Sequence, residues 1–147
     1  MYTKGAKEYS QVSLQTEVME ADPHKLIQLL LEGALTRLAM AKNCMEQKDI
    51  EGRNEKIGRA IDIICALQES LDHEQGGEIS TNLERLYDYM TRRLFDANRL
   101  NDVDMVNEVM GLLLEVKSGW EGIRDSYEEM RNQGKFKEDN QKSSVSV

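Results

Sequence analysis

The sequence VDMVNEVMGLLLEVKSGWEGIRDSYEEM, residues 103–130, decides the fold expected of this chain. Its apolar residues recur at alternating steps of three and four, which is the pattern of one continuous helical stripe. These residues are Val106, Val109, Leu113, Val116, Trp120, Ile123, Tyr127 and Met130. At the rise of an α-helix the stretch forms a rod of roughly 42 Å, which cannot bury its stripe alone. Other helices must therefore supply the remaining walls, and we expect Trp120 near the middle of the space they enclose.

Three upstream stretches have the pattern of such helices, over residues 23–46, about 49–71 and about 78–98. Asp22 and Pro23 predict the first start, because an aspartate caps a helix and a proline at the first position loses no hydrogen bond. The residues expected to face inward are Ile27, Leu30, Ala34, Leu38, Ala41 and Met45, then Ile57, Ile61, Ile64, Leu67 and Leu71, then Ile79, Leu83, Leu86, Met90, Leu94 and Ala97.

The links between these helices predict how they are arranged. Residues 47–49 form a short link, residues 72–77 read as a turn in which Gly76 and Gly77 are free to take positive φ, and Asn101 and Asp102 mark the last turn. Links this short force successive helices to be antiparallel neighbours. The sequence therefore predicts an all-α protein with an antiparallel, up-down four-helix bundle over residues 22–130.

The two ends of the chain differ from the bundle in pattern. In residues 1–21, Val12, Leu14, Thr16 and Val18 alternate with polar residues, a period that suits an extended segment with one apolar face. This segment either lies along a groove of the bundle or is a frayed terminus. Residues 131–147 are polar and carry a small net positive charge, so we expect a disordered tail.

Composition limits the classes of function. The formal net charge is −8, which opposes binding to nucleic acid or to an anionic membrane surface. Cys44 and Cys65 have no metal-ligand spacing, so buried thiols are favoured over a disulfide. No apolar run is long enough for a membrane span or a signal peptide, and we expect a cytoplasmic protein without membrane insertion.

The sequence offers little to an enzyme. Neither His24 nor His73 has a glutamate three residues before it, as a di-iron bundle requires, and neither lies in mid-helix, as histidine phosphotransfer requires. Gly76 and Gly77 are not followed by the lysine and hydroxyl residue of a phosphate-binding loop. We therefore expect no catalytic activity, no metal and no cofactor.

Apolar residues remain after each helix has been given one inward stripe. They are Leu26, Leu29, Met40, Ile50, Ile63, Tyr89, Phe95, Met105, Leu112 and Leu114. A wider core could absorb part of this surplus, but a helical protein with leucine and methionine on its outer faces is also a candidate groove for an amphipathic helix. The alternative is a helical scaffold that buries these residues against copies of itself.

The order and spacing of many residues resemble the FliS family of flagellin-specific export chaperones. The matching residues are Pro23, Leu26, Ile27, Leu30, Glu32, Gly33 and Ala34, then Gly76, Gly77, Glu78, Ile79, Asn82, Leu83, Leu86, Tyr87, Tyr89, Met90, Leu94, Ala97 and Asn98, then Asp102, Glu108, Val109, Leu112, Leu113 and Trp120. The resemblance covers about residues 9–125. The chain departs from it at Leu31, where the family usually has an aromatic residue, and this affects the expected shape of the groove.

The resemblance implies a cytoplasmic chaperone that binds the disordered C-terminal region of flagellin, prevents its premature polymerisation and delivers it to the flagellar export gate. It also implies that the N-terminal segment can occupy part of the flagellin groove, and that other flagellar regulators are possible partners. Together with the surplus apolar residues it gives a candidate partner-binding set: Tyr9, Val12, Leu26, Leu29, Ile50, Ile63, Tyr89, Phe95 and Leu112.

Overall fold

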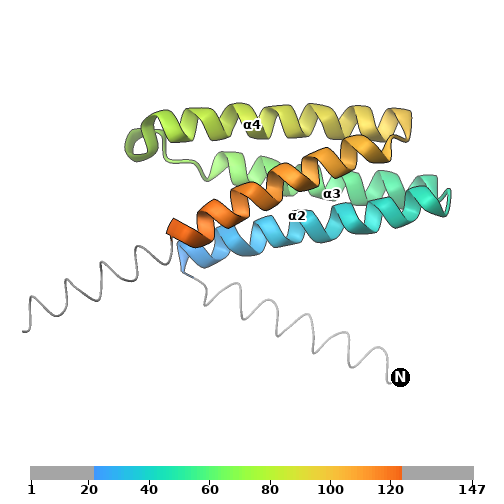
Figure 1. The fold of residues 1–147 in the computed structure, drawn as a ribbon, viewed down its shortest axis with the longest axis horizontal. Coiled ribbons are helices and arrows are strands. Elements are labelled where there is room, and N and C mark those ends of the chain that lie inside the picture. Colours follow the sequence, from blue (N-terminus) through green and yellow to red (C-terminus); the bar gives the residue numbers. More distant parts are fainter. Residues whose placement is uncertain (1–21, 124–147) are drawn as a thin grey trace, which may run out of the picture.

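The computed structural model describes residues 22–123, and this part of the chain contains four helices joined by short links. They are α2 (Pro23–Glu46), α3 (Ile50–Glu69), α4 (His73–Leu100) and a helix that continues from residue 103 to the last described residue, named here helix 103–123. Successive helices run in opposite directions, and helix 103–123 lies between α2 and α4 (Figure 1). The all-α, up-down four-helix bundle is therefore confirmed. The expected extended N-terminal segment and disordered tail lie outside the described residues.

Aspartates explain where three of the four helices begin. The carboxylate of Asp22 accepts a hydrogen bond from the backbone N–H of Lys25 at 2.7 Å, and Asp49 accepts one from Gly52 at 3.0 Å. Asp102 accepts from the N–H groups of residues 104 and 105 at the start of helix 103–123. Each carboxylate satisfies a backbone donor that has no partner within its helix.

The start of α4 differs from the expected turn over residues 72–77. Asp72 caps the helix, accepting from the N–H groups of Glu74 and Gln75 at 3.1 Å each, so that a helical turn already begins at His73. Gly77 then breaks the helix with φ 50° and ψ −121°, which confirms the positive φ expected there. At the other end of α4, Asn101 adopts φ 53° and ends the helix in the left-handed conformation.

The core lies along the axis of the bundle and contains most of the residues predicted to face inward. The fully or almost fully buried side chains are Leu31, Ala34, Leu38, Ala41, Met45, Ile57, Ala60, Ile61, Ile64, Leu67, Tyr87, Met90, Leu94, Ala97, Val106, Val109 and Leu113. Leu31 is among them, so the residue at which the chain departs from the FliS pattern belongs to the core and does not shape an outer groove.

Two isoleucines that were predicted to face inward are exposed, so the prediction is wrong for both. Ile79 is 68% exposed because the break at Gly77 resets the helix, and Ser80 faces inward instead, with its hydroxyl donating to the Asp72 carbonyl at 2.9 Å. Ile123 is 55% exposed. The preceding turn of its helix already lies level with the first turn of α2, so Ile123 has passed the end of the wall that would cover it.

The expected central position of Trp120 is also wrong. The indole is half-buried and stacks on the imidazole of His24, with ring centroids 4.5 Å apart and ring planes 10° from parallel. Its Nε1–H donates to the His24 carbonyl at 2.9 Å, and His24 Nε2 donates to the Trp120 carbonyl at 2.7 Å. This reciprocal contact joins helix 103–123 to α2 at one end of the bundle.

Candidate partner-binding surface

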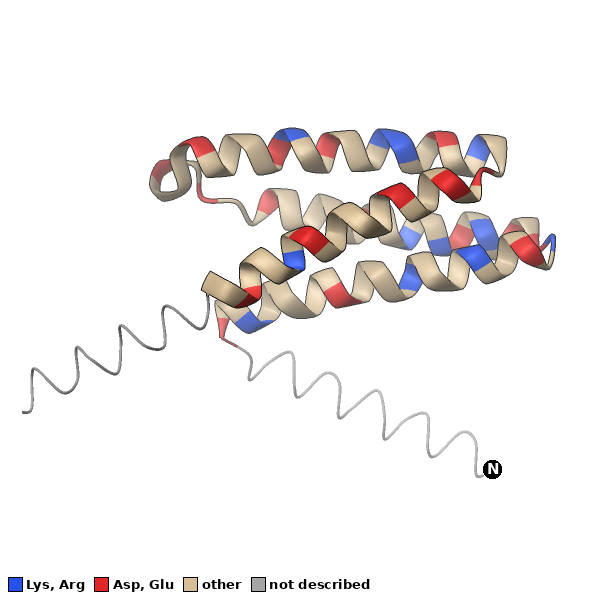
Figure 2. Ribbon diagram, in the orientation of Figure 1, with Lys and Arg blue, Asp and Glu red and all other residues tan. Residues whose placement is uncertain are grey.

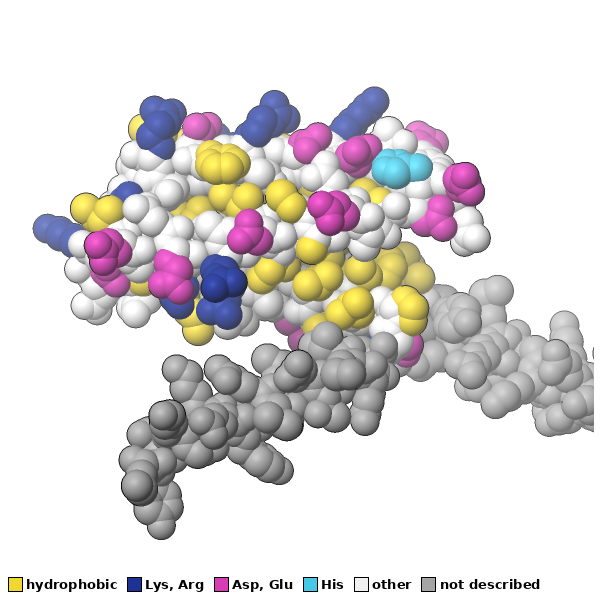
Figure 3. Space-filling model, turned by 180° about the vertical axis from the view of Figure 1, so that it is seen from behind, with side chains coloured by type: hydrophobic (Ala, Val, Ile, Leu, Met, Phe, Trp, Pro, Cys, Tyr) yellow, Lys and Arg dark blue, Asp and Glu magenta, His cyan; other side chains and the backbone are white. Residues whose placement is uncertain are grey.

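One group of the candidate residues lies on the outer face of α2 and α3. A Cβ built on Gly33 would lie 3.6 Å from Cδ1 of Ile63, an ordinary contact distance, so Ile63 of α3 lies beside this part of α2. Leu29 lies one turn before Gly33 and is half-buried, and Leu26 lies about another turn earlier and is 38% exposed. Apolar side chains gather toward the end at which α2 begins (Figure 3, lower right).

A second group lies on the seam between α4 and helix 103–123. The Tyr89 hydroxyl donates to the two carboxylate oxygens of Glu108 at 2.7 and 3.1 Å, and Arg93 Nε donates to the same carboxylate at 2.8 Å. The Arg93 guanidinium lies over the Tyr89 ring, 5.9 Å from its centroid. Leu112, one turn after Glu108, is half-buried and packs against the core. Tyr89 and Leu112 therefore lie on one seam.

The hydrogen bonds among Tyr89, Arg93 and Glu108 shift the pKa values of these side chains. The hydrogen bond from Tyr89, followed by that from Arg93, lowers the pKa of Glu108. The same carboxylate raises the pKa of Tyr89, because an ionised phenol would lose the bond to Glu108 and repel it. Tyr89 thus remains a neutral donor, and its side chain is 37% exposed.

The remaining described candidates are not part of either group. Ile50 is 61% exposed at the first residue of α3, at the opposite end of the bundle from Leu26, and Phe95 is 59% exposed on α4. Tyr9 and Val12 lie outside the described residues. The structure therefore divides the described candidate residues among separate surfaces and does not gather them into one site.

Ile50 lines an open hollow at its end of the bundle, and another lies beside it. The first hollow has a volume of about 340 Å³ and is also lined by Cys44, Lys48, Asp49, Arg53 and Asn101. The second, of about 570 Å³, lies on the other side of Asn101 and is lined by Ala39, Lys42, Asn43, Met45, Glu46 and Val103. The guanidinium of Arg53 holds this end together by donating to Asn98 at 2.8 Å and Asn101 at 2.9 Å.

Several exposed apolar residues were not among the candidates. They are Met40, Ile79, Leu100, Val103, Leu114 and Ile123, each between 40% and 68% exposed. Met40 and Leu114 had already been recognised in the sequence as outside the inward stripes. Leu100 and Val103 flank the turn between α4 and helix 103–123, and only the position of that turn could have indicated their exposure.

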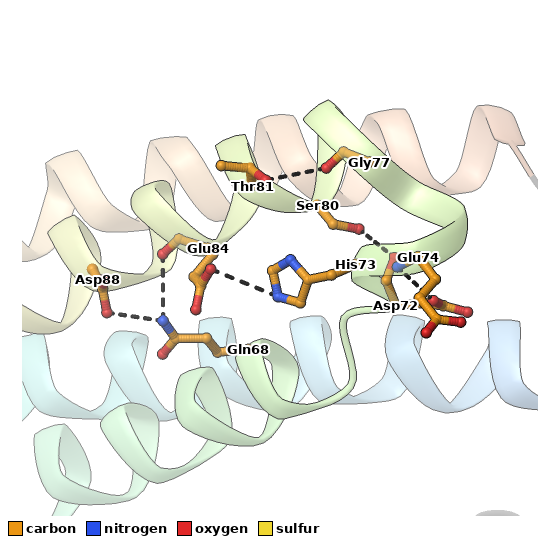
Figure 4. A network of polar contacts seen from close by, with 9 residues as sticks. All are labelled: Gln68, Asp72, His73, Glu74, Gly77, Ser80, Thr81, Glu84 and Asp88. Atoms are coloured by element: carbon orange, nitrogen blue, oxygen red, sulfur yellow. Dashed lines mark hydrogen bonds and ion pairs between the residues drawn. The ribbon is translucent and has the colours of Figure 1, made fainter.

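A network of polar contacts fixes the link between α3 and α4 (Figure 4). Gln68 Nε2 donates to Asp88 at 2.8 Å, which joins the end of α3 to the second half of α4. His73 Nε2 lies 3.6 Å from a carboxylate oxygen of Glu84. These contacts place His73 at the first position of α4, beside Glu84.

The polar groups have no arrangement suited to a metal centre in the part of the chain that is described. Within residues 22–123 no group of three or more His, Cys, Asp or Glu side chains could hold a metal ion. Cys44 and Cys65 are both free and half-buried, where buried thiols had been expected. None of the described helices is long and apolar enough to cross a membrane.

Comparison with known proteins supports the resemblance found in the sequence. The family model described as flagellar protein FliS matches residues 5–127. A protein named flagellar secretion chaperone FliSB from Pseudomonas aeruginosa is 53% identical over 120 residues, which cover 82% of this chain and 95% of that protein. The flagellar secretion chaperones FliS of Salmonella typhimurium and Vibrio cholerae are 46% and 40% identical, covering 89% and 81% of this chain and 100% and 88% of those proteins.

Proposed function

Because this chain belongs to the FliS family of flagellar proteins, we propose that it is a cytoplasmic export chaperone for flagellin. It binds the disordered C-terminal region of flagellin, prevents premature polymerisation and delivers the subunit to the flagellar type III export apparatus. Relatives that carry the name flagellar secretion chaperone support this proposal.

The observation that carries the proposal is the apolar surface that the bundle leaves uncovered. The core along the bundle axis is complete without Leu26, Tyr89 or Phe95, each of which is at least 37% exposed. Half-buried Leu29, Ile63 and Leu112 extend the apolar surface inward from two of these positions. Such a surface suits an amphipathic helix, whose apolar side chains enter the shallow grooves between neighbouring helices.

The mechanism is folding coupled to binding. An isolated flagellin tail cannot bury enough apolar area to offset the loss of conformational entropy, so it orders only against the chaperone. The bound segment is then shielded from other flagellin subunits. The proposal includes no nucleotide-driven step. Flagellin is instead released when the export gate competes with the chaperone for it.

The N-terminal segment has a role in this proposal. Tyr9 and Val12 belong to residues that precede α2, and α2 begins beside Leu26. We propose that residues 9–18 lie along the flagellin groove in the free protein and are displaced by flagellin. This arrangement would cover the α2–α3 apolar face between cycles of binding.

The experiment is a titration of the full chain with the C-terminal segment of flagellin, followed by calorimetry and by circular dichroism. We expect saturable binding, a gain of helical signal beyond the sum of the two components and a negative heat-capacity change, which marks burial of apolar surface. Binding without any gain of helix would contradict coupled folding, and no binding would contradict the proposed partner.

A self-associating helical scaffold is the second candidate function. Exposed Ile50, Leu100 and Val103 at one end of the bundle favour it, because they form apolar surface away from the α2–α3 face. Sedimentation of the protein alone separates the two functions. A scaffold forms oligomers as its concentration rises, whereas the chaperone proposal predicts a monomer that becomes a one-to-one complex on addition of the flagellin segment.

A further inference from the structure

The end of α3 and the start of α4 carry exposed carboxylates, and residues 60–84, which lie between Arg59 and Arg85, contain no lysine or arginine. Residues 60–84 contain Asp62, Glu69, Asp72, Glu74, Glu78 and Glu84, with His73 as their one ionisable base. Asp72, Glu74 and Glu84 lie around this histidine (Figure 4), and acidic side chains gather at the same end of the surface (Figure 3, upper right), whereas lysine and arginine gather toward the other end of the bundle (Figure 2). An exposed apolar residue, Ile79, directly follows Glu78 in this segment.

Part of this negative charge has a structural role and part does not. Asp72 caps α4, and Glu84 lies beside His73. Among residues 22–123, Glu69, Glu74 and Glu78 form none of the ion pairs found within 4.0 Å. Like charges that are left unpaired on one face repel one another, so this face gains stability from a cationic ligand.

The chain itself contains a segment of opposite charge. Residues 131–142 carry four cations, Arg131, Lys135, Lys137 and Lys142, against two carboxylates, and include one aromatic residue, Phe136. The described bundle ends at Ile123, where the contact between Trp120 and His24 holds helix 103–123 against the start of α2. The link between α3 and α4 lies at this same end of the bundle (Figure 1).

We propose that residues 131–142 of this chain dock on the acidic face formed by the end of α3 and residues 73–84 of α4. Lysine and arginine side chains pair with Glu69, Glu74 and Glu78, and Phe136 covers Ile79. The occupant is chosen by charge complementarity and by the position at which the chain leaves the bundle. This contact is separate from the flagellin surface and does not depend on the proposed function.

The distances allow such a contact. Neighbouring helices pack with axes 8–10 Å apart, and the twelve residues 131–142 span up to about 40 Å when extended, which is sufficient to cross one helix. A tethered segment also acts at an effective concentration in the millimolar range, so weak ion pairs are enough to populate the docked state. The segment need not fold, because its side chains bind through charge and one aromatic contact.

The test is zero-length cross-linking of the full chain with a carbodiimide, which joins a lysine amine directly to a carboxylate in contact with it. We expect cross-links from Lys135 and Lys137 to Glu74 and Glu78, with a yield that does not depend on protein concentration. Raising the salt from 20 mM to 1 M shortens the screening length to about 3 Å and should lower the yield about tenfold.

Charge reversal supplies the matched variants. Lys135→Glu with Lys137→Glu should abolish these cross-links, and adding Glu74→Lys with Glu78→Lys should restore them with the polarity reversed. Glu51→Lys with Glu55→Lys, at the opposite end of the bundle, is the control and should leave the yield unchanged. Circular dichroism establishes that each variant is folded.

Three outcomes would overturn the proposal. Cross-links from Lys135 and Lys137 spread evenly over the carboxylates of the bundle would show that the segment has no preferred face. A yield that rises with protein concentration would make a second copy of the chain the occupant. Failure of the swapped charges to restore the cross-links in a folded variant would exclude charge pairing as the cause.

Discussion

The imidazole of His24 and the indole of Trp120 exchange hydrogen bonds through each other's backbone carbonyls while their rings stack 4.5 Å apart. This contact joins the first turn of α2 to helix 103–123, and it lies at the end of the bundle where the described chain both begins and ends. The bundle is closed there by two specific side chains, whereas the core along its axis consists of buried apolar side chains.

Trp120→Ala should therefore destabilise the protein. The substitution removes the aromatic stack and leaves the His24 carbonyl without its donor, so we expect a loss of about 2–3 kcal/mol in the free energy of unfolding. Urea denaturation followed by circular dichroism measures it. Ile123→Ala, one turn later and 55% exposed, is the control and should cost less than about 0.5 kcal/mol. Equal losses in the two variants would contradict the structural role of the contact.

Two glycines should respond to alanine with opposite signs. Gly77 has a φ of 50°, which alanine adopts only with strain, so Gly77→Ala should lower stability by about 1–2 kcal/mol. Gly58 lies within α3, and a Cβ there would meet nothing within 4 Å, so Gly58→Ala should raise stability by about 0.5–1 kcal/mol. Thermal unfolding of both variants against the parent protein checks the two signs. A stabilising effect at residue 77 would contradict the helix break.

The burial of Tyr87 leads us to expect that the free energy of unfolding falls at alkaline pH. Burial raises the pKa of this phenol to about 12, whereas in the unfolded chain it ionises near 10. The folded state therefore holds the proton more tightly, and the stability contributed by the neutral phenol is present below pH 10 and lost as the pH rises toward 12. Between these values each pH unit costs up to about 1.4 kcal/mol.

Tyr87→Phe keeps the ring and removes the ionising group. Urea denaturation at pH 9 and pH 11 should show a smaller loss of stability in this variant than in the parent protein. Tyr89→Phe is less suitable for the comparison, since it also removes the hydrogen bond to Glu108. An equal loss at pH 11 in the Tyr87→Phe variant would mean that Tyr87 is not the group responsible.

Much of the fold could be predicted because short-range rules determine it. Asp22 with Pro23, Asp49 and Asp102 mark helix starts through hydrogen bonds formed within three residues, and all three carboxylates accept the bonds expected of them. The inward stripes of the two middle helices follow from helical periodicity. The inward prediction for Ile79 was wrong because the break at Gly77 changes the direction of the side chains that follow.

The candidate surface was less predictable, because it depends on how each helix is rotated and where it ends. The sequence indicates that Leu26, Ile63 and Tyr89 lie outside the one inward apolar stripe of each helix. It does not indicate that they belong to different faces of the bundle. Leu31 shows the same difficulty, since only the packing of α2 reveals that it is fully buried. The pairing of Trp120 with His24 joins residues that are 96 positions apart and has no local signal.

The central claim is that apolar residues outside the core bind flagellin, and Leu26 tests it most directly. Its side chain is 38% exposed on the first turns of α2, where an aspartate is favourable to the helix dipole and should leave folding unchanged. Leu100→Asp is the control, since Leu100 is 53% exposed but was never part of the candidate set.

The measurement is the calorimetric affinity of each variant for the C-terminal segment of flagellin, together with its urea midpoint. The account predicts that Leu26→Asp weakens binding at least about tenfold, equivalent to about 1.4 kcal/mol, with an unchanged midpoint and with no effect of Leu100→Asp. Parent-like affinity of a folded Leu26→Asp variant would contradict it.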